Sequence, residues 1–173
     1  MSTTAQIYNA QLDSLIDDLK SDHALTRRHA RAALIETGAP AVASLVALLS
    51  DSGALTRWEA VKTLGEIGGP DVAEALVRTM EHDQDEGVRW LAADGLAELY
   101  EEGLAPLLEM LIHHSDCVWL RDSAHHVLRK LSHTRLDKLV APVLEALEGI
   151  EPAIVLPPIA QNALKALNEH DRR

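Results

Sequence analysis

One carboxylate and two imidazoles within a short stretch are the side chains of this chain best suited to chemistry. The segment Arg121–Leu131 reads RDSAHHVLRKL, and its Asp122 stands four residues before His126. In a helix, side chains four residues apart lie on the same face, so this pair could bind one metal ion. A third ligand, Asp94, would come from an adjacent helix. Two carboxylates and one imidazole with open positions form a ligand set that suits Fe, Mn or Zn.

The same residues also have a purely structural explanation. Carboxylate–imidazole pairs four residues apart occur on ordinary helix surfaces, where they add only a weak local contact. We therefore expect no bound cofactor, and keep Fe, Mn or Zn at Asp94, Asp122 and His126 as the alternative. The neighbouring His125 lies about 100° round the helix from His126, so it should face the adjacent repeat.

The composition predicts helices throughout. The chain has 173 residues, of which 47% are hydrophobic, and it contains no Phe. Its apolar content is mostly Ala and Leu, which are both strong helix formers. This content is sufficient for a continuous core, so one all-helical domain or a short array of repeats is expected.

Charge and targeting signals limit the expected partners and compartment. The formal net charge is −11, and such a chain repels phosphate groups, so neither nucleic acids nor anionic membranes are expected partners. The single cysteine, Cys117, excludes an intramolecular disulfide and fits a reducing compartment. No apolar run is long enough to span a bilayer, and the opening MSTTAQIYNA lacks the features of a signal peptide. We therefore expect a cytoplasmic protein.

A repeated pattern accounts for most of the chain. Four segments align without internal gaps, each with Ala three residues and Leu seven residues after an Arg: RRHARAALIETG from Arg27, RWEAVKTLGEIG from Arg57, RWLAADGLAELY from Arg89 and RDSAHHVLRKLS from Arg121. An acidic residue stands five or six residues before each Arg, at Asp22, Asp51, Asp83 and Asp116. Each acidic turn follows an apolar segment such as LDSLIDDL or AVASLVALL. The unit is therefore a first helix, a short acidic turn and a second helix.

A fifth, degenerate copy is expected at the end of the chain. LDKLVAPVLEALEG supplies its first helix and PPIAQNALKAL its second, with Pro157 in place of the Arg. A terminal unit lacks one neighbour and so departs from the common pattern. We predict a single domain over residues 9–168, with second helices starting near residues 27, 57, 89, 121 and 157. Residues 1–8 and 169–173 are expected to be flexible ends.

The repeat resembles the short HEAT-like repeats of the phycobilisome-lyase-like group. The resemblance is carried by the acidic turn, by Arg-x-x-Ala-x-x-x-Leu, and most clearly by RWEAVKTLGEIGGPDVAEAL, and it covers residues 10–168. It implies an all-α fold, a right-handed α-α superhelix (α-solenoid) of about five HEAT-like helix-pair repeats. It also implies that the second helices line a concave groove. The repeat Arg is expected to pair with the acidic residue of its own or the neighbouring turn.

Helical phase predicts which side chains face this groove. With the repeat Arg as position zero, positions three, seven and ten should face the first helices, whereas positions one, five and eight should line the groove. The distinctive residues at the groove positions are Arg28, Trp58, Lys62, Trp90, Asp94, Asp122, His126 and Arg129. Exposed tryptophans commonly anchor binding partners, so Trp58 and Trp90 are the expected anchors. The alternative is that each indole packs over the neighbouring helix and only thickens the core.

These observations favour a protein-binding module over an enzyme. The chain lacks a Gly-rich phosphate loop, a Cys cluster and a nucleophile elbow, which are the common signatures of catalysis in single sequences. We expect a non-catalytic scaffold that holds a protein or peptide in the groove. The alternative is a metal- or cofactor-dependent enzyme, oxidoreductase- or lyase-like, with its site at Asp94, Asp122 and His126.

Overall fold

The computed structural model describes residues 3–170, and this part of the chain contains helices and turns but no strand. The helices are α1 (Thr3–Leu19), α2 (Ala24–Thr37), α3 (Ala39–Leu48), α4 (Ala54–Ile67), α5 (Pro70–His82), α6 (Glu86–Glu98), α7 (Glu101–His113), α8 (Val118–Leu131), α9 (Asp137–Glu148) and α10 (Pro152–His170). None of these helices is both long enough and apolar enough to cross a membrane. The predicted all-α fold is confirmed.

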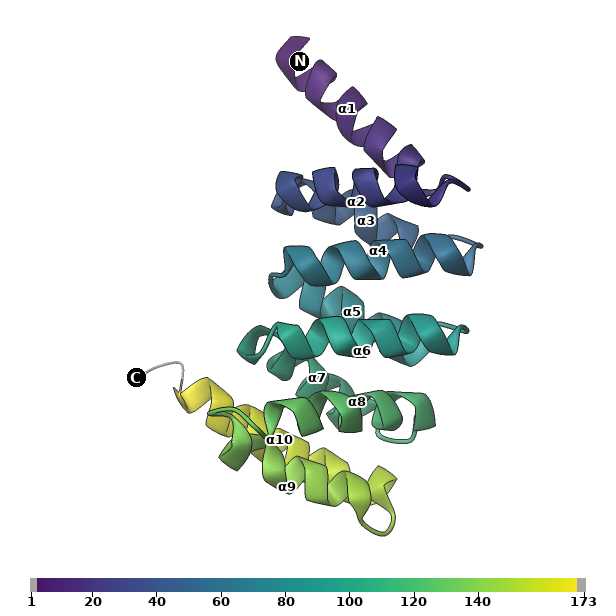
Figure 1. The fold of residues 1–173 in the computed structure, drawn as a ribbon. Coiled ribbons are helices and arrows are strands. Elements are labelled where there is room, and N and C mark those ends of the chain that lie inside the picture. Colours follow the sequence, from purple (N-terminus) through teal and green to yellow (C-terminus); the bar gives the residue numbers. More distant parts are fainter. Residues whose placement is uncertain (1–2, 171–173) are drawn as a thin grey trace.

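The helices form two layers (Figure 1). In one layer, α2, α4, α6 and α8 lie side by side, each against the next, and α3, α5 and α7 form the layer behind them. Consecutive helices also pair across the layers, most extensively α5 with α6, α9 with α10, α1 with α2, and α3 with α4. The fold is therefore an α-solenoid, in which each helix pair buries its apolar surface against its own members and the adjacent pairs.

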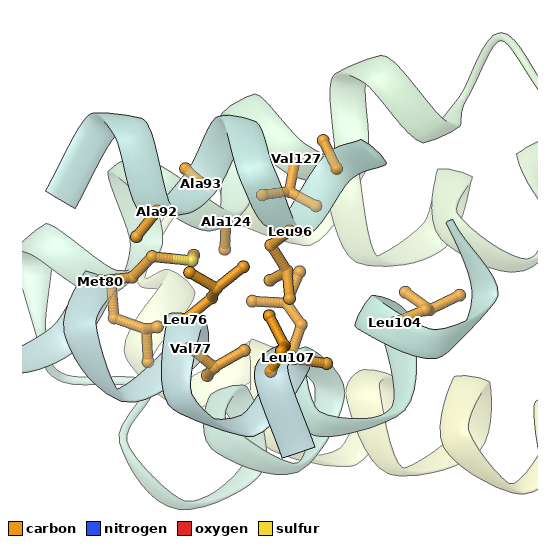
Figure 2. Close-up of a cluster of buried hydrophobic side chains, with 14 of the residues drawn as sticks. Leu76, Val77, Met80, Ala92, Ala93, Leu96, Leu104, Leu107, Ala124 and Val127 are labelled. Atoms are coloured by element: carbon orange, nitrogen blue, oxygen red, sulfur yellow. The ribbon is translucent and has the colours of Figure 1, made fainter. Parts of the chain in front are cut away.

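The aligned alanines and leucines form the seam between the layers. The alanines at position three are at most 2% exposed and the leucines at position seven are fully buried: Ala30, Ala60, Ala92, Ala124, Leu34, Leu64, Leu96 and Leu128. Figure 2 shows the middle of this core, where Leu76, Leu96, Leu107 and Val127 come together from α5, α6, α7 and α8. The small alanines let the helices approach and the leucines fill the remaining space, as close packing requires. The predicted inward face of the second helices is confirmed.

Glycine and proline mark two of the reversals between repeats. Gly38 and Gly68 end α2 and α4 with φ angles of 68° and 73°, in the left-handed region that glycine adopts at little cost. Pro40 and Pro70 follow within the first turn of α3 and α5, where the missing N–H would be unpaired in any case. The glycine and proline therefore define where α2 and α4 end and where α3 and α5 begin.

Each repeat arginine closes the turn that precedes it. Nη1 of Arg27, Arg57, Arg89 and Arg121 donates to the backbone carbonyl six residues earlier, at Ser21, Asp51, Asp83 and Ser115, over 2.6–3.0 Å. The second helices begin three residues before these arginines, near the predicted positions. Helical side chains lean toward the N-terminus, so an arginine one turn inside the helix can reach back to the turn. The contact also satisfies a carbonyl near the end of the first helix, where intrahelical donors are absent.

One of these arginines also joins two repeats through an acidic turn, as predicted. Nε and Nη2 of Arg57 donate to the two carboxylate oxygens of Asp83, in the next turn, at 2.7 and 2.8 Å. Burial alone would raise the pKa of the Asp83 carboxyl, but the hydrogen bonds from Arg57 and from the Asp85 N–H outweigh it and hold the pKa below its usual range. The charged carboxylate is therefore the form that the fold stabilises.

Two other arginines reach the next repeat by different contacts. Nε of Arg27 donates to the buried carboxylate of Glu59 on α4, which also accepts a hydrogen bond from Arg31. The guanidinium of Arg89 lies over the indole of Trp119 on α8, 4.1 Å from the ring centroid. The acidic-turn partner predicted for these two arginines is thus replaced by a helix carboxylate in one case and by an aromatic ring in the other.

The last helix pair exchanges the two layers. α9 packs beside α8, whereas α10 packs against α7 and α9 and makes no contact with α8 within residues 3–170. The predicted second helix at Pro157 is therefore misplaced: the helix begins at Pro152 and lies in the first-helix layer. Pro157, which takes the arginine's place in the aligned pattern, has no side-chain donor for the contact with the preceding turn. Leu156, Ala160 and Leu167 are buried where α10 meets its new neighbours.

Both chain ends differ from the predicted boundaries. α1 already begins at Thr3 and α10 continues to His170. Residues 3–8 and 169–170, expected to be loose, therefore belong to helices. Residues 1–2 and 171–173, which complete the predicted flexible ends, lie outside the described part of the chain.

The Arg57–Asp83 contact should make the free energy of unfolding depend on pH. The Asp83 pKa is lower in the fold than the value of about 3.9 expected when unfolded, so the contact stabilises the fold above that pH and is lost as the pH falls below it. Asp83→Asn should lower the free energy of unfolding by about 3 kcal/mol at pH 7 and weaken its decline in acid. Urea unfolding between pH 7 and pH 3 measures both effects.

The matched control is Asp51→Asn, at the equivalent turn, where within the described residues the carboxylate accepts a hydrogen bond from the Gly53 N–H and none from an arginine. This change should have a clearly smaller effect. Equal losses in the two variants would contradict a special role for the Arg57–Asp83 contact.

Candidate functional site

The exposed side of α2, α4, α6 and α8, called the second-helix face below, carries the predicted groove residues. Five of them are exposed and three half-buried: Arg28, Trp90, Asp94, Asp122 and Arg129 in the first group, Trp58, Lys62 and His126 in the second. Position eight fits less well, because Ala97 is only 4% exposed. At the same level a Cβ on Gly65 would lie 3.2 Å from the Cα of Gly95, so α4 and α6 touch there. A small hollow of about 260 Å³ lies beside this contact, lined by residues that include Lys62, Glu66 and Asp94.

Two indoles of neighbouring helices stand out on this face. Trp90 of α6 is 49% exposed and Trp119 of α8 is 47% exposed. The Trp90 ring lies 4.5 Å from the ring of His126, tilted by 58°, and Trp119 rests on the Arg89 guanidinium. Each indole thus has one side supported and another open to solvent, the arrangement expected of a pre-positioned contact residue.

Trp58 occupies a different environment from the one predicted. Its indole is half-buried and packs against the hydrophobic core, and the Lys62 ammonium lies 4.8 Å from its ring centroid. The core packing and the Lys62 ammonium both cover the ring, so the burial of this indole stabilises the position of α4. The environment of Trp58 therefore resembles that of an indole packed over its neighbouring helix more than that of an exposed binding anchor.

A broad hollow lies between α2 and α4, with a volume of about 560 Å³. Its lining includes Arg28, Leu55, Trp58 and Lys62. Leu55 is 51% exposed, and Arg28 has no ion-pair partner within the described residues. This end of the second-helix face is therefore apolar and basic, although the chain as a whole is acidic.

A smaller hollow of about 210 Å³, called the aromatic notch below, lies between α6 and α8. It is lined by Glu86, Arg89, Trp90, Trp119, Asp122 and Ser123. Its walls are the two exposed indoles, and its rim carries two exposed carboxylates. The notch therefore differs from the α2–α4 hollow in both shape and sign of charge.

Asp94 is the centre of a charged network that joins α6 to α8. His126 Nε2 and Lys130 Nζ both donate to Asp94 Oδ1, at 2.8 and 3.0 Å, and Lys130 also reaches Glu98 at 3.2 Å. Burial would raise the pKa of the Asp94 carboxyl, but the hydrogen bonds from His126 and Lys130 prevail and keep that pKa below its usual range. These contacts are partly exposed, so they orient the side chains more than they stabilise the fold.

The three residues predicted as metal ligands do not converge. Asp94 and His126 meet, but Asp122 lies at the aromatic notch instead. Within the described residues no three His, Cys, Asp or Glu side chains are arranged to hold a metal ion. His125, as predicted, faces the next element, with Nε2 2.9 Å from a carboxylate oxygen of Glu148 on α9.

Trp119 is the functional candidate that the sequence interpretation did not include. Position minus two lies three residues before position one and seven before position five, so it belongs to the same face of the helix. This position holds Leu25, Leu55, Gly87 and Trp119. Leu25 and Leu55 are 69% and 51% exposed there. The periodicity of the sequence therefore places Trp119 on the groove side. It was missed because the helix was taken to begin at Arg121, two residues after Trp119.

Comparison with known proteins supports the repeat assignment. A family model described as HEAT repeats matches residues 12–97. A chain from the solved complex of CpcE and CpcF of phycocyanin lyase from Nostoc sp. PCC7120 superposes with a TM-score of 0.61, covering 88% of this chain and 98% of that chain at 24% identity. The chain contains HEAT repeats. The resemblance to phycobilisome-lyase-like HEAT repeats is thereby confirmed for the fold.

No curated protein matches the chain in sequence. The distinctive exposed side chains of this helical array gather on its second-helix face.

Collisional quenching distinguishes the three tryptophans of the HEAT-like chain. Variants that keep one tryptophan, with the other two replaced by phenylalanine, should be titrated with acrylamide while fluorescence is recorded. Trp90 and Trp119 should quench to a similar extent because similar fractions of their surfaces are exposed, and Trp58 should quench less. A Trp58 signal that quenches as readily as the other two would contradict its packed position.

Proposed function

We propose that this chain is a non-catalytic protein-binding module that holds a segment of a partner protein across its second-helix face. The observation that carries the proposal is the pair of half-exposed indoles, Trp90 and Trp119, on adjacent helices of one rigid array. Large exposed aromatic side chains are costly in water and are enriched at the centres of protein interfaces. Their support by His126 and Arg89 reduces the entropy that binding would cost.

The shape and charge of the face support the same proposal. It carries several shallow hollows, among them a basic one between α2 and α4 and one edged by carboxylates between α6 and α8. A solenoid face of this kind suits an extended segment that crosses several helices. The solved HEAT-like structure described above is itself a complex of two proteins, which is in keeping with a partner-binding role.

The alternative of a metal-dependent enzyme has less support. Lys130 and His126 already occupy one oxygen of the Asp94 carboxylate. Asp122 is directed to a different part of the face. A binding function uses the same residues as they stand, without rearrangement.

Affinity purification followed by titration tests the proposal. A partner captured by the wild-type chain from its own cell extract should be purified and titrated against the variants by calorimetry. Trp90→Ala and Trp119→Ala should each weaken binding by about 2 kcal/mol or more, roughly thirtyfold. The cause would be the loss of a large contact from the centre of the interface.

The control for general apolar truncation is Ile154→Ala. Ile154 is 69% exposed on α10, in the other layer of the array, so its loss should leave the affinity unchanged. Capture of no partner, or a partner that binds both tryptophan variants with wild-type affinity, would refute the proposed surface.

A further inference from the structure

The aromatic notch carries an excess of negative charge beside its two indoles. Glu86 and Asp122 are exposed on its rim, and neither has an ion-pair partner within the described residues. The one cation of the notch, Arg89, is buried, donates to the Asp83 carbonyl and lies against Trp119. The notch therefore has two carboxylates for one guanidinium.

We infer that the aromatic notch binds a cationic side chain, an arginine or a lysine, from a basic segment of the partner. This inference rests on the proposed function and specifies the partner's chemistry. A guanidinium or ammonium group is attracted both to the face of an indole and to nearby carboxylates. The contact between Arg89 and Trp119 shows that one of these rings already accepts a cation at 4.1 Å.

Other occupants fit this notch less well. An acidic side chain would be repelled by Glu86 and Asp122. A purely apolar one would bury part of these two carboxylates without giving them a partner, which costs free energy. A basic side chain is the one class that satisfies the carboxylates and also covers the indoles.

The long-range charge of the molecule agrees with the local argument. The net charge of −11 attracts a basic segment from a distance and raises the rate of encounter. The α2–α4 hollow is the exception, because its unpaired Arg28 and its Lys62 repel cations. A basic side chain is thus directed toward α6 and α8, and Trp58 serves as an internal reference that it should not contact.

Nuclear magnetic resonance of the indole N–H groups tests the inference directly. The full chain, labelled with ¹⁵N, should be titrated with the capped pentapeptide Gly-Ser-Arg-Ser-Gly, with its lysine analogue, and with the neutral analogue that contains citrulline. The Arg and Lys peptides should shift the Trp90 and Trp119 signals and leave Trp58 in place. The citrulline peptide should bind at least about threefold more weakly, because it has the shape of arginine without the charge.

Two substitutions and one control localise the effect. Asp122→Asn and Trp90→Leu should each weaken binding of the Arg peptide by about two- to fivefold. Glu109→Gln removes the same charge from an exposed position on α7, in the other layer, and should have less effect than Asp122→Asn.

Three outcomes would overturn the cation site: no shift of the Trp90 and Trp119 signals, equal binding of the citrulline peptide, or equal losses in Asp122→Asn and Glu109→Gln. None of them depends on the captured partner. The cation site can therefore fail while the calorimetric titration still supports the proposed function, and the reverse also holds.

Discussion

One hydrogen bond recurs in every complete repeat, between the repeat arginine and the carbonyl six residues before it. It holds the first turn of each second helix against the turn before it, and helical phase then decides which side chains face outward. Where Pro157 replaces the arginine, the final helix crosses to the other layer. The second-helix face therefore depends on this contact.

The sequence predicted the buried side of the helices well, because burial follows from helical phase and side-chain volume. Ala92 and Leu96 are inward as their spacing requires. Phase gives an angle round one helix but no distance between helices, so it could not show that His126 contacts Asp94 on α6 and not Asp122 on its own helix. The layer of α10 could not be predicted either, because the pattern gives the apolar side of a helix but not the neighbour that this side meets.

Stability and recognition share residues in this molecule. Arg89 closes the third turn with its Nη1 and supports the Trp119 indole with the plane of its guanidinium. The proposed contact residue is thus held by the scaffold itself and not by a mobile loop, which limits the entropy lost when a partner binds. The basic hollow at α2–α4 and the acidic notch at α6–α8 would further fix the direction in which a segment lies across the array.

Hydrogen–deuterium exchange of the chain, alone and with its captured partner, tests the central claim most directly. If the second-helix face is the working surface, the partner should slow amide exchange in the amino-terminal turns of α6 and α8, and change α5 and α7 little. Protection centred on α5 and α7, with α6 and α8 unchanged, would contradict the account.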